Sequence, residues 1–305
     1  MSSVVRDSSH AGSWYSSNPK ELSRQLAEWL SAADTPFDGP ARAIISPHAG
    51  YTYSGATAAY AFKQIVPDNI ETVFILGPSH VVCLNCCSLS TCSRYRTPFG
   101  DLIIDQEINN ELLRSGKFDL MDPESEEAEH SLEMQLPFLY KVMEKKVPGT
   151  GYKIVPILVG SLSKKQQDDY GQILSRYIVD PKVLFVISSD FCHWGNRFGF
   201  SPYNQLLNKP VYEQIADLDQ EGMEAISSLN PNVFNDYLKT TQNTICGRNP
   251  ICVLLQAVEH SRQKQSKEIS AELRFIKYAQ SNQCRSTNDS SVSYAAGVLY
   301  ISSTH

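Results

Sequence analysis

The chain has 305 residues, 42% of them hydrophobic and 20% charged, and this composition is typical of a globular protein with a sizeable core. Its formal net charge of −6 argues against nucleic acid as a partner, because proteins that bind the phosphate backbone carry a basic patch. The polar first residues predict no signal peptide, and no stretch approaches the roughly 20 apolar residues of a membrane span, so we expect a cytoplasmic protein whose eight cysteines are free thiols.

Hydrophobic periodicity and turn residues predict a chain in which helices and strands alternate. In the first half of the chain, helices are predicted at Leu22–Leu30, Gly55–Ile65, Ile108–Leu113 and Ser131–Lys145. Buried strands are predicted at Ala43–Ile45 and Val73–Leu76. The strand, helix and strand between residues 43 and 76 form a βαβ unit, which implies that the two strands are parallel.

The second half continues the same pattern. Strands are predicted at Tyr152–Val159, Val183–Ile187, Leu273–Tyr278 and Val292–Ile301, and helices at Lys164–Ile178, Pro210–Ser228, Val233–Lys239 and Pro250–Arg262. Pro156 predicts an edge position or a bulge for its strand, and Asn249 is expected to cap the helix that begins at Pro250. We therefore predict an α/β fold for residues 1–305, a single domain with a mostly parallel central sheet flanked by helices.

Three predicted strands end in turns that carry histidine. His48 follows the first strand, His80 follows the second, and Asp190 and His193 follow the strand Val183–Ile187. In open α/β sheets, ligands bind outside the carboxyl ends of the strands, so these residues are expected to converge. A lone histidine is more often structural than functional. Several histidines at separate strand ends, beside glycines that let a ligand approach, favour a shared site.

The pair Asp190 and His193 has two interpretations. The functional one is a carboxylate beside a general base or a third imidazole ligand. The structural one is that Asp190 caps the next turn while His193 packs against Trp194. Of the two, the functional interpretation is favoured modestly.

Cys246 lies just ahead of a predicted helix. A helix N-terminus and the nearby Arg248 lower the pKa of a thiol, so the sulfur is a candidate metal ligand or nucleophile. The alternative is an inert buried cysteine, and the spacing alone favours that alternative. A thiolate together with two imidazoles would suit copper, zinc or iron rather than magnesium or calcium.

Two further clusters carry weaker signals. The segment Glu129–Glu133, which contains His130, either lines a pocket or complements the dipole of the helix that it begins. Four cysteines follow His80, namely Cys83, Cys86, Cys87 and Cys92. No second Cys-x-x-Cys pair stands at a suitable distance, so free thiols on a loop are favoured over a zinc site.

Several of these motifs together resemble the Memo family. The matching segments are His10–Tyr15, Pro47–Tyr51, Gly77–His80, Glu129–Glu133, Ser188–Gly195, Asn243–Gly247 and Ser290–Gly297, and they span nearly the whole chain. In two places the sequence departs from the pattern, because Val81 and Asn249 stand where many relatives have histidine. The resemblance implies an α/β fold similar to that of class III extradiol non-haem iron dioxygenases.

The resemblance also implies site residues and partners. His48, His80 and Cys246 would bind a copper or iron ion, with Asp190 and His193 beside them as catalytic residues of any turnover. Trp14 would hold a phosphotyrosine peptide together with His48, His80, His193 and Cys246. The family is linked to receptor tyrosine kinase signalling, the microtubule cytoskeleton, cell migration and redox chemistry. The implied partners are a phosphorylated receptor tail or adaptor and cytoskeletal regulators, and the implied location is the cytoplasm and the nucleus.

The sequence is therefore compatible with two functions. One is a metal-binding signalling protein that captures phosphotyrosine peptides. The other is a metal-dependent oxidase or extradiol-type dioxygenase that acts on a small aromatic substrate, in which Asp190 supplies the carboxylate that such enzymes place beside two histidines.

Overall fold

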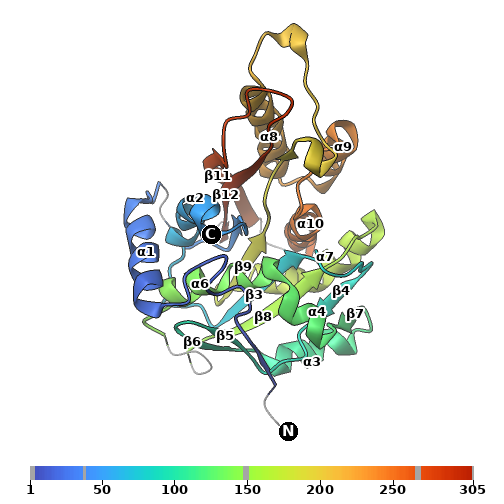
Figure 1. Ribbon diagram of the computed structural model, residues 1–305. Coiled ribbons are helices and arrows are strands. Elements are labelled where there is room, and N and C mark those ends of the chain that lie inside the picture. Colours follow the sequence, from blue (N-terminus) through green and yellow to red (C-terminus); the bar gives the residue numbers. More distant parts are fainter. Residues whose placement is uncertain (1–3, 37–38, 147–150, 265–268, 304–305) are drawn as a thin grey trace.

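The computed structural model describes residues 4–36, 39–146, 151–264 and 269–303 (Figure 1). Its strands are β1 (Val5–Arg6), β2 (Ala43–Ser46), β3 (Thr72–Pro78), β4 (Cys87–Leu89), β5 (Arg94–Thr97), β6 (Gly100–Ile103), β7 (Phe118–Leu120), β8 (Lys153–Val159), β9 (Val183–Ser188), β10 (His193–Trp194), β11 (Ile269–Gln280) and β12 (Ser291–Ser303). Its α-helices are α1 (Pro19–Ala32), α2 (Tyr51–Lys63), α3 (Gln106–Arg114), α4 (Pro123–Ala128), α5 (His130–Glu133), α6 (Leu136–Val142), α7 (Lys164–Ile178), α8 (Val211–Ser227), α9 (Pro231–Thr241) and α10 (Arg248–Lys264). Two short 3₁₀ helices, η1 (Asn196–Phe198) and η2 (Gln205–Leu207), precede α8.

The main sheet is mixed, with a parallel centre. Its strand order is β10-β12-β2-β9-β3-β8-β4-β7, and β11 pairs with β12. The four central strands β2, β9, β3 and β8 are parallel, whereas β12 joins β2 and β4 joins β8 in the antiparallel direction. The predicted α/β class is therefore confirmed, and the parallel part of the sheet is limited mainly to its centre. Strands β1, β5 and β6 form a separate small sheet.

Alternate residues of the central strands pack on opposite faces of the main sheet. Phe74 and Phe185 lie on the face covered by α7 and α10, where their ring centroids are 4.8 Å apart. Val73 and Leu184 lie on the other face, against α1, α2 and α6. Because both faces are covered, the strands are apolar along their whole length, which made them recognisable in the sequence. In Figure 1 the yellow segment that contains η1 and η2 projects from the body near α8.

Two local predictions were wrong for reasons that involve proline. The strand with Pro156 is central, because β8 lies between β3 and β4. Strand β4 pairs only with Ile157–Val159 of β8. Pro156 precedes these residues and lies just outside the pairing with β4. The predicted helix Ser131–Lys145 is interrupted between α5 and α6, and Pro137 lies in the first turn of α6, where a missing N–H is tolerated.

Helices α2 and α10 begin earlier than predicted. Helix α2 begins at Tyr51, only three residues after His48, and α10 begins at Arg248, two residues after Cys246. Asn249 therefore lies inside α10, where its side chain accepts hydrogen bonds from Leu162 and Gln167 instead of capping the helix.

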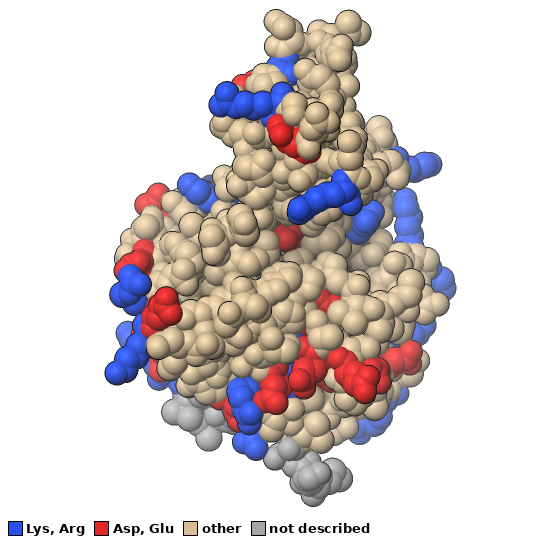
Figure 2. Space-filling model, viewed as in Figure 1, with Lys and Arg blue, Asp and Glu red and all other residues tan. Residues whose placement is uncertain are grey.

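In the described part of the chain, none of the helices has the length and apolar character that crossing a membrane requires. Figure 2 shows acidic side chains gathered over the lower part of one face and basic side chains around its outline.

Candidate metal centre

The strands that precede the predicted site residues lie side by side in the main sheet. Strand β9 pairs in parallel with β2 on one side and with β3 on the other, so the three strands end at the same edge. His48 follows β2, His80 follows β3, and Asp190 and His193 follow β9. The ring centroids of His48 and His80 are 5.1 Å apart. The strand ends thus converge, as the sequence predicts.

His48 is buried, and its hydrogen bonds determine which ring nitrogen carries a proton. Nδ1 lies 2.7 Å from the Ser188 hydroxyl, which donates its own proton to the carbonyl oxygen of Ser131. Ser188 also accepts a hydrogen bond from the side-chain amide of Gln135. Since a hydroxyl has one proton to donate, Ser188 accepts from His48, and Nδ1 is protonated. The unprotonated Nε2 faces Cys246, whose Sγ is 3.2 Å away.

A buried carboxylate orients His80 in a similar way. Glu129 accepts hydrogen bonds from Nδ1 of His80 at 3.0 Å and from the backbone N–H of His80 at 2.6 Å. It also accepts the backbone N–H of Ser131 at 2.9 Å. Burial raises the pKa of Glu129, but the hydrogen bonds and charge of His80 outweigh that effect and lower it to about 2. The ionised Glu129 therefore keeps the His80 proton on Nδ1 and leaves Nε2 free to bind another group.

Cys246 reaches His48 from the turn that precedes α10. Its Sγ accepts the backbone N–H of Asp190 at 3.2 Å. Gly247 lets this turn approach β9, because a Cβ at this position would lie 2.3 Å from Cβ of Ser189. Burial raises the pKa of the Cys246 thiol, and the charge of Asp190 raises it further. The N–H of Gly247 at the helix start lowers this pKa, as expected, but burial and Asp190 outweigh it, so the sulfur needs a cation beside it to ionise at neutral pH.

The described residues contain two groups of side chains whose ligand atoms all lie within 4.8 Å of one another. His48, His80 and Cys246 form the first group, and His80, Glu129 and His130 form the second. The first group fits a transition-metal ion, because Nε2 of each histidine is free and sulfur is a soft donor. In the second group the oxygens of Glu129 already accept several protein N–H groups. Glu129 therefore serves to orient His80.

Asp190 is a buried carboxylate beside the first group. Its Oδ1 accepts the backbone N–H of His48 at 2.8 Å, and its Oδ2 lies 4.0 Å from Nε2 of the same residue. Burial raises the pKa of Asp190, and the charge of His193 opposes that increase. Within the described ranges, Asp190 belongs to neither group of ligand atoms. In this structure it therefore positions the His48 backbone.

His193 lies close to Asp190 at the start of β10. Its Nδ1 faces the carbonyl oxygens of Phe191 at 2.9 Å and Thr244 at 3.2 Å. Because a carbonyl only accepts, Nδ1 carries the proton. The ring of His193 meets the ring of Phe198 edge-on, with centroids 5.3 Å apart. In the tautomer that these carbonyls select, Nε2 carries no proton, which is the form that a general base requires.

An aromatic stack connects His80 with Trp14. The His130 ring lies nearly parallel to that of His80 with centroids 4.4 Å apart, and Trp14 packs on His130 at 4.6 Å. Trp14 is 37% exposed, so this stack reaches the surface. Burial and the charge of His80 lower the pKa of His130 to about 4, and His130 is therefore neutral at pH 7. The sequence left the position of the Glu129–Glu133 segment open, and the structure places its first two residues at the site.

Asp219, in α8, connects the two loops that carry His193 and Cys246. Its fully buried carboxylate accepts the backbone N–H of Cys192 at 3.2 Å, the side-chain amide of Asn243 at 2.9 Å and the Tyr278 hydroxyl at 2.8 Å. Nothing in the sequence predicted a role for this residue. Asp219 stands in an amphipathic helix among exposed acidic residues, and no local pattern distinguishes it from them.

Among the residues that the structure describes, the cysteines between 83 and 92 belong to neither group of candidate metal ligands. All eight cysteines of the chain are free thiols, as predicted. Cys83 is exposed, whereas Cys87 is buried in β4 and Cys92 is buried beyond it. The prediction that these residues share a loop is therefore wrong for Cys87.

Comparisons with known proteins identify relatives along nearly the whole chain. A family model described as Memo-like protein matches residues 6–298. The Caenorhabditis elegans protein named memo-1 homolog is 60% identical over 297 residues, which cover 97% of this chain and 83% of that protein. The proteins named MEMO1 from Xenopus laevis and Homo sapiens are 50% and 48% identical, each over 98% of both chains. Among solved structures, an uncharacterized Escherichia coli K12 protein has a TM-score of 0.44 at 12% identity, over 82% of this chain and 98% of that one, which supports no further conclusion.

Proposed function

Because this chain belongs to the Memo-like protein family, we propose that it is an intracellular metal-binding protein that holds a copper or iron ion through His48, His80 and Cys246. One observation carries this proposal. Each of the three residues offers one possible ligand atom, and these atoms all lie within 4.8 Å of one another. Imidazole nitrogen and thiolate sulfur are donors that such transition metals prefer.

The residues around the three donors prepare them for this role. Ser188 and Glu129 hold the protons of the two histidines on Nδ1, and hydrogen bonds of this kind orient metal-binding imidazoles. Cys246 must release its proton when an ion binds, so protons compete with the ion at acidic pH. A bound copper or iron ion would supply one-electron exchange at the site.

Elemental analysis of protein purified without chelators tests the proposal. We expect copper or iron in amounts close to that of the protein, and loss of the metal in His48→Ala. Cys246→Ser should weaken copper binding far more than Cys252→Ser, because a hydroxyl is a harder donor than a thiolate. Cys252 is buried in α10 and serves as the matched control. Equal copper affinity in the two serine variants would remove Cys246 from the site.

The resemblance to the Memo family supports a further proposal about the cell. We place this protein in the cytoplasm and nucleus, in receptor tyrosine kinase signalling to the cytoskeleton and cell migration. Its partners would be a phosphorylated receptor tail or adaptor and cytoskeletal regulators. The residues proposed to contact the phosphopeptide are Trp14, His48, His80, His193 and Cys246. Calorimetry with phosphorylated and unphosphorylated forms of one peptide tests this, and equal affinities would count against it.

The second candidate function is a metal-dependent oxidase or extradiol-type dioxygenase acting on a small aromatic substrate. The observation in its favour is the carboxylate of Asp190, whose Oδ2 lies 4.0 Å from Nε2 of His48. Extradiol enzymes bind ferrous iron with two histidines and a carboxylate. Asp190 and His193 would then be the catalytic residues. Oxygen uptake by the iron-loaded protein with a panel of catechols tests this function, and no uptake with any of them excludes it.

A further inference from the structure

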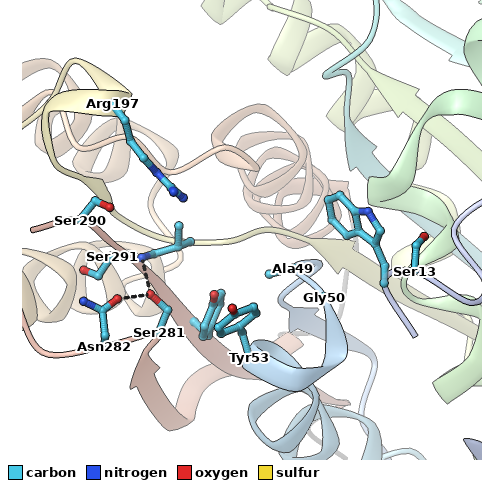
Figure 3. A pocket seen from close by; sticks show the side chains of 12 residues that line it. Ser13, Ala49, Gly50, Tyr53, Arg197, Ser281, Asn282, Ser290 and Ser291 are labelled. Carbon is cyan, nitrogen blue, oxygen red and sulfur yellow. Dashed lines mark hydrogen bonds between the residues drawn. The ribbon is translucent and has the colours of Figure 1, made fainter. Parts of the chain in front are cut away.

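A cavity of about 470 Å³ opens beside the candidate metal centre (Figure 3). Ala49 and Gly50, which directly follow His48 in the chain, form part of its wall, and Trp14 lines it as well. Its volume lies in the range of about 300–1,000 Å³ that is usual for small-molecule sites. None of the three candidate metal ligands is among the described residues that line it. The cavity is therefore a separate candidate binding site, adjacent to the proposed metal site.

The charge inside this cavity is opposite to that of the protein as a whole. Arg197 in η1 extends its guanidinium group into the cavity (Figure 3). The twelve described residues that line the cavity include no aspartate, glutamate or lysine. Across the described ranges, no carboxylate forms an ion pair with Arg197 within 4.0 Å. In a chain with a net charge of −6, this local positive charge favours an anionic ligand.

The loop that carries Arg197 is closed by its own hydrogen bonds. The backbone N–H of Gly195 donates to the carbonyl oxygen of Phe200 at 2.7 Å, and that of Phe198 donates to Gly195 at 2.9 Å. The Arg197 guanidinium carbon lies 4.4 Å from the centroid of the Phe198 ring, which itself packs against His193. The hydrogen bonds fix the loop backbone, and the Phe198 ring favours one position of the guanidinium group, which reduces the entropy lost when a ligand binds.

Aromatic rings and serine side chains form much of the remaining wall. Trp14 is 37% and Tyr53 is 63% exposed, so both rings have free surface, and Tyr294 adds a buried ring. Ser290 contributes a hydroxyl group near Arg197, whereas the Ser281 hydroxyl already donates to Asn282 and accepts the backbone N–H of Val292 (Figure 3). Aromatic side chains pack well against a flat ring, and hydroxyl groups can complete the hydrogen bonds of an anion. The walls therefore favour a ligand that combines an aromatic ring with an anionic group.

We propose that this cavity binds a small aromatic carboxylate, with the carboxylate on Arg197 and the ring against Trp14 and Tyr53. The planar guanidinium group can donate two parallel hydrogen bonds to a carboxylate. Phosphate groups on peptides are usually bound by clusters of arginine, and Arg197 is the only cationic residue among the described residues that line the cavity. The proposal goes beyond metal binding and holds whether or not an ion is bound.

Titrations of the full-length protein with benzoate, benzamide and phenyl phosphate, followed by protein NMR, test the proposal. Benzamide has the shape of benzoate without its charge, and phenyl phosphate carries the ring on a phosphate ester. We expect benzoate to bind most tightly of the three and to shift the signals of Tyr53 and Trp14. Equal binding of benzamide, tighter binding of phenyl phosphate, or no binding of benzoate would each overturn the proposal.

Variants of Arg197 identify the anion site. Arg197→Gln should weaken benzoate binding by about tenfold or more, because a charge-assisted pair is lost. Arg197→Lys should recover part of the affinity, since it keeps the charge without the planar geometry. Arg24→Gln is the matched control, because Arg24 is exposed on α1 and pairs with Glu28. An unchanged benzoate affinity in Arg197→Gln would contradict the proposal.

A comparison of metal-loaded and chelator-treated protein separates this inference from the proposed metal site. If the protein binds neither copper nor iron but still binds benzoate through Arg197, the metal proposal fails and the carboxylate site stands. If metal binds and benzoate does not, the carboxylate site fails alone. A phosphotyrosine peptide that binds more tightly than benzoate and depends on Arg197 would assign the cavity to the peptide and overturn the carboxylate proposal.

Discussion

His48 and Cys246 are 198 positions apart in the sequence, yet Nε2 of the one lies 3.2 Å from Sγ of the other. A strand pairing and a hydrogen bond bring these two residues together. Strand β2 lies next to β9 in the sheet, and the turn before α10 is fixed to the end of β9 by a hydrogen bond from the Gly247 N–H to the Ser189 hydroxyl. Changes at these supporting residues should therefore disturb the pair without removing either member.

The first prediction concerns the Ser188 hydroxyl, which accepts the Nδ1 proton of His48. Ser188→Ala leaves the imidazole free to change tautomer, so we expect copper affinity to fall by about 10- to 100-fold. Titration against a competing copper chelator measures this. Ser261→Ala is the control, because Ser261 is also buried but donates only within its own helix, to Val258. Equal affinities in the two variants would show that Ser188 does not control the tautomer.

The second prediction is a loss of stability in acid that depends on Glu133. Its buried carboxylate accepts hydrogen bonds from Arg6 at 2.8 Å, the Tyr15 hydroxyl at 2.7 Å and His10 Nδ1 at 2.8 Å. Burial raises the pKa of Glu133, but the hydrogen bond from His10 and the charge of Arg6 outweigh it and lower it from 4.5 to about 2. A carboxyl group with a lower pKa in the folded state stabilises the protein above pH 4.5.

That contribution is lost as the pH falls from about 4.5 towards 2, and for Glu133 alone it amounts to about 3 kcal/mol of unfolding free energy. Glu133→Gln should be less stable than wild type at pH 7 and should lose less further stability in acid. Urea unfolding at pH 7 and at pH 3 measures both effects. Glu144→Gln removes an exposed carboxylate and serves as the control. An acid loss as large in Glu133→Gln as in wild type would contradict this prediction.

The centre of the fold could be predicted because its strands are buried on both faces. The predicted strands Ala43–Ile45, Val73–Leu76 and Val183–Ile187 lie within β2, β3 and β9. Uninterrupted apolar runs bounded by turn residues gave this signal. The short strands at the edges, such as Cys87–Leu89 and Phe118–Leu120, have mixed composition and were not predicted, because tertiary contacts rather than local sequence determine them.

The candidate site was predicted only in part, for a similar reason. His48 and His80 could be found because each follows a strong strand signal, and strand ends meet at one edge. Cys246 depended on the resemblance. Glu129 and Asp219 act through contacts with chain segments far away in the sequence, which no spacing reveals. Arg197 stands in η1, a 3₁₀ helix of three residues that is too short to show a periodic pattern.

The third prediction concerns Asp219, which holds the loops of His193 and Cys246 together. Asp219→Ala leaves the Cys192 N–H, the Asn243 amide and the Tyr278 hydroxyl without this acceptor, so we expect the free energy of unfolding to fall by about 2–4 kcal/mol. Copper affinity should fall as well, because the Cys246 turn loses its support. Asp217→Ala, on the exposed side of α8, should change the free energy of unfolding by less than about 0.5 kcal/mol.

Urea unfolding and copper titration of both variants measure these effects. If Asp219→Ala lost stability but bound copper as tightly as wild type, Asp219 would support the fold without positioning the site. If neither property changed, its hydrogen bonds would contribute nothing that water could not replace.

The last prediction uses the close approach of Gly247 to β9. A Cβ at residue 247 would lie 2.3 Å from Cβ of Ser189 and 2.6 Å from the carbonyl oxygen of Ser188, so the start of α10 must move in Gly247→Ala. That movement takes Cys246 away from His48. We expect the free energy of unfolding to fall by about 1–3 kcal/mol, and copper affinity to fall by more than about tenfold.

Gly116→Ala is the control for Gly247→Ala, because a Cβ at residue 116 meets nothing within 4 Å. Its φ of +69° still makes alanine unfavourable by about 1 kcal/mol, so the two variants lose similar stability for different reasons. Of these two variants, only Gly247→Ala should lose copper affinity, because residue 247 lies next to Cys246 and packs against Ser189. If Gly247→Ala kept wild-type copper affinity despite its lower stability, the sulfur of Cys246 would not be a ligand, and the ion would depend on the histidines alone.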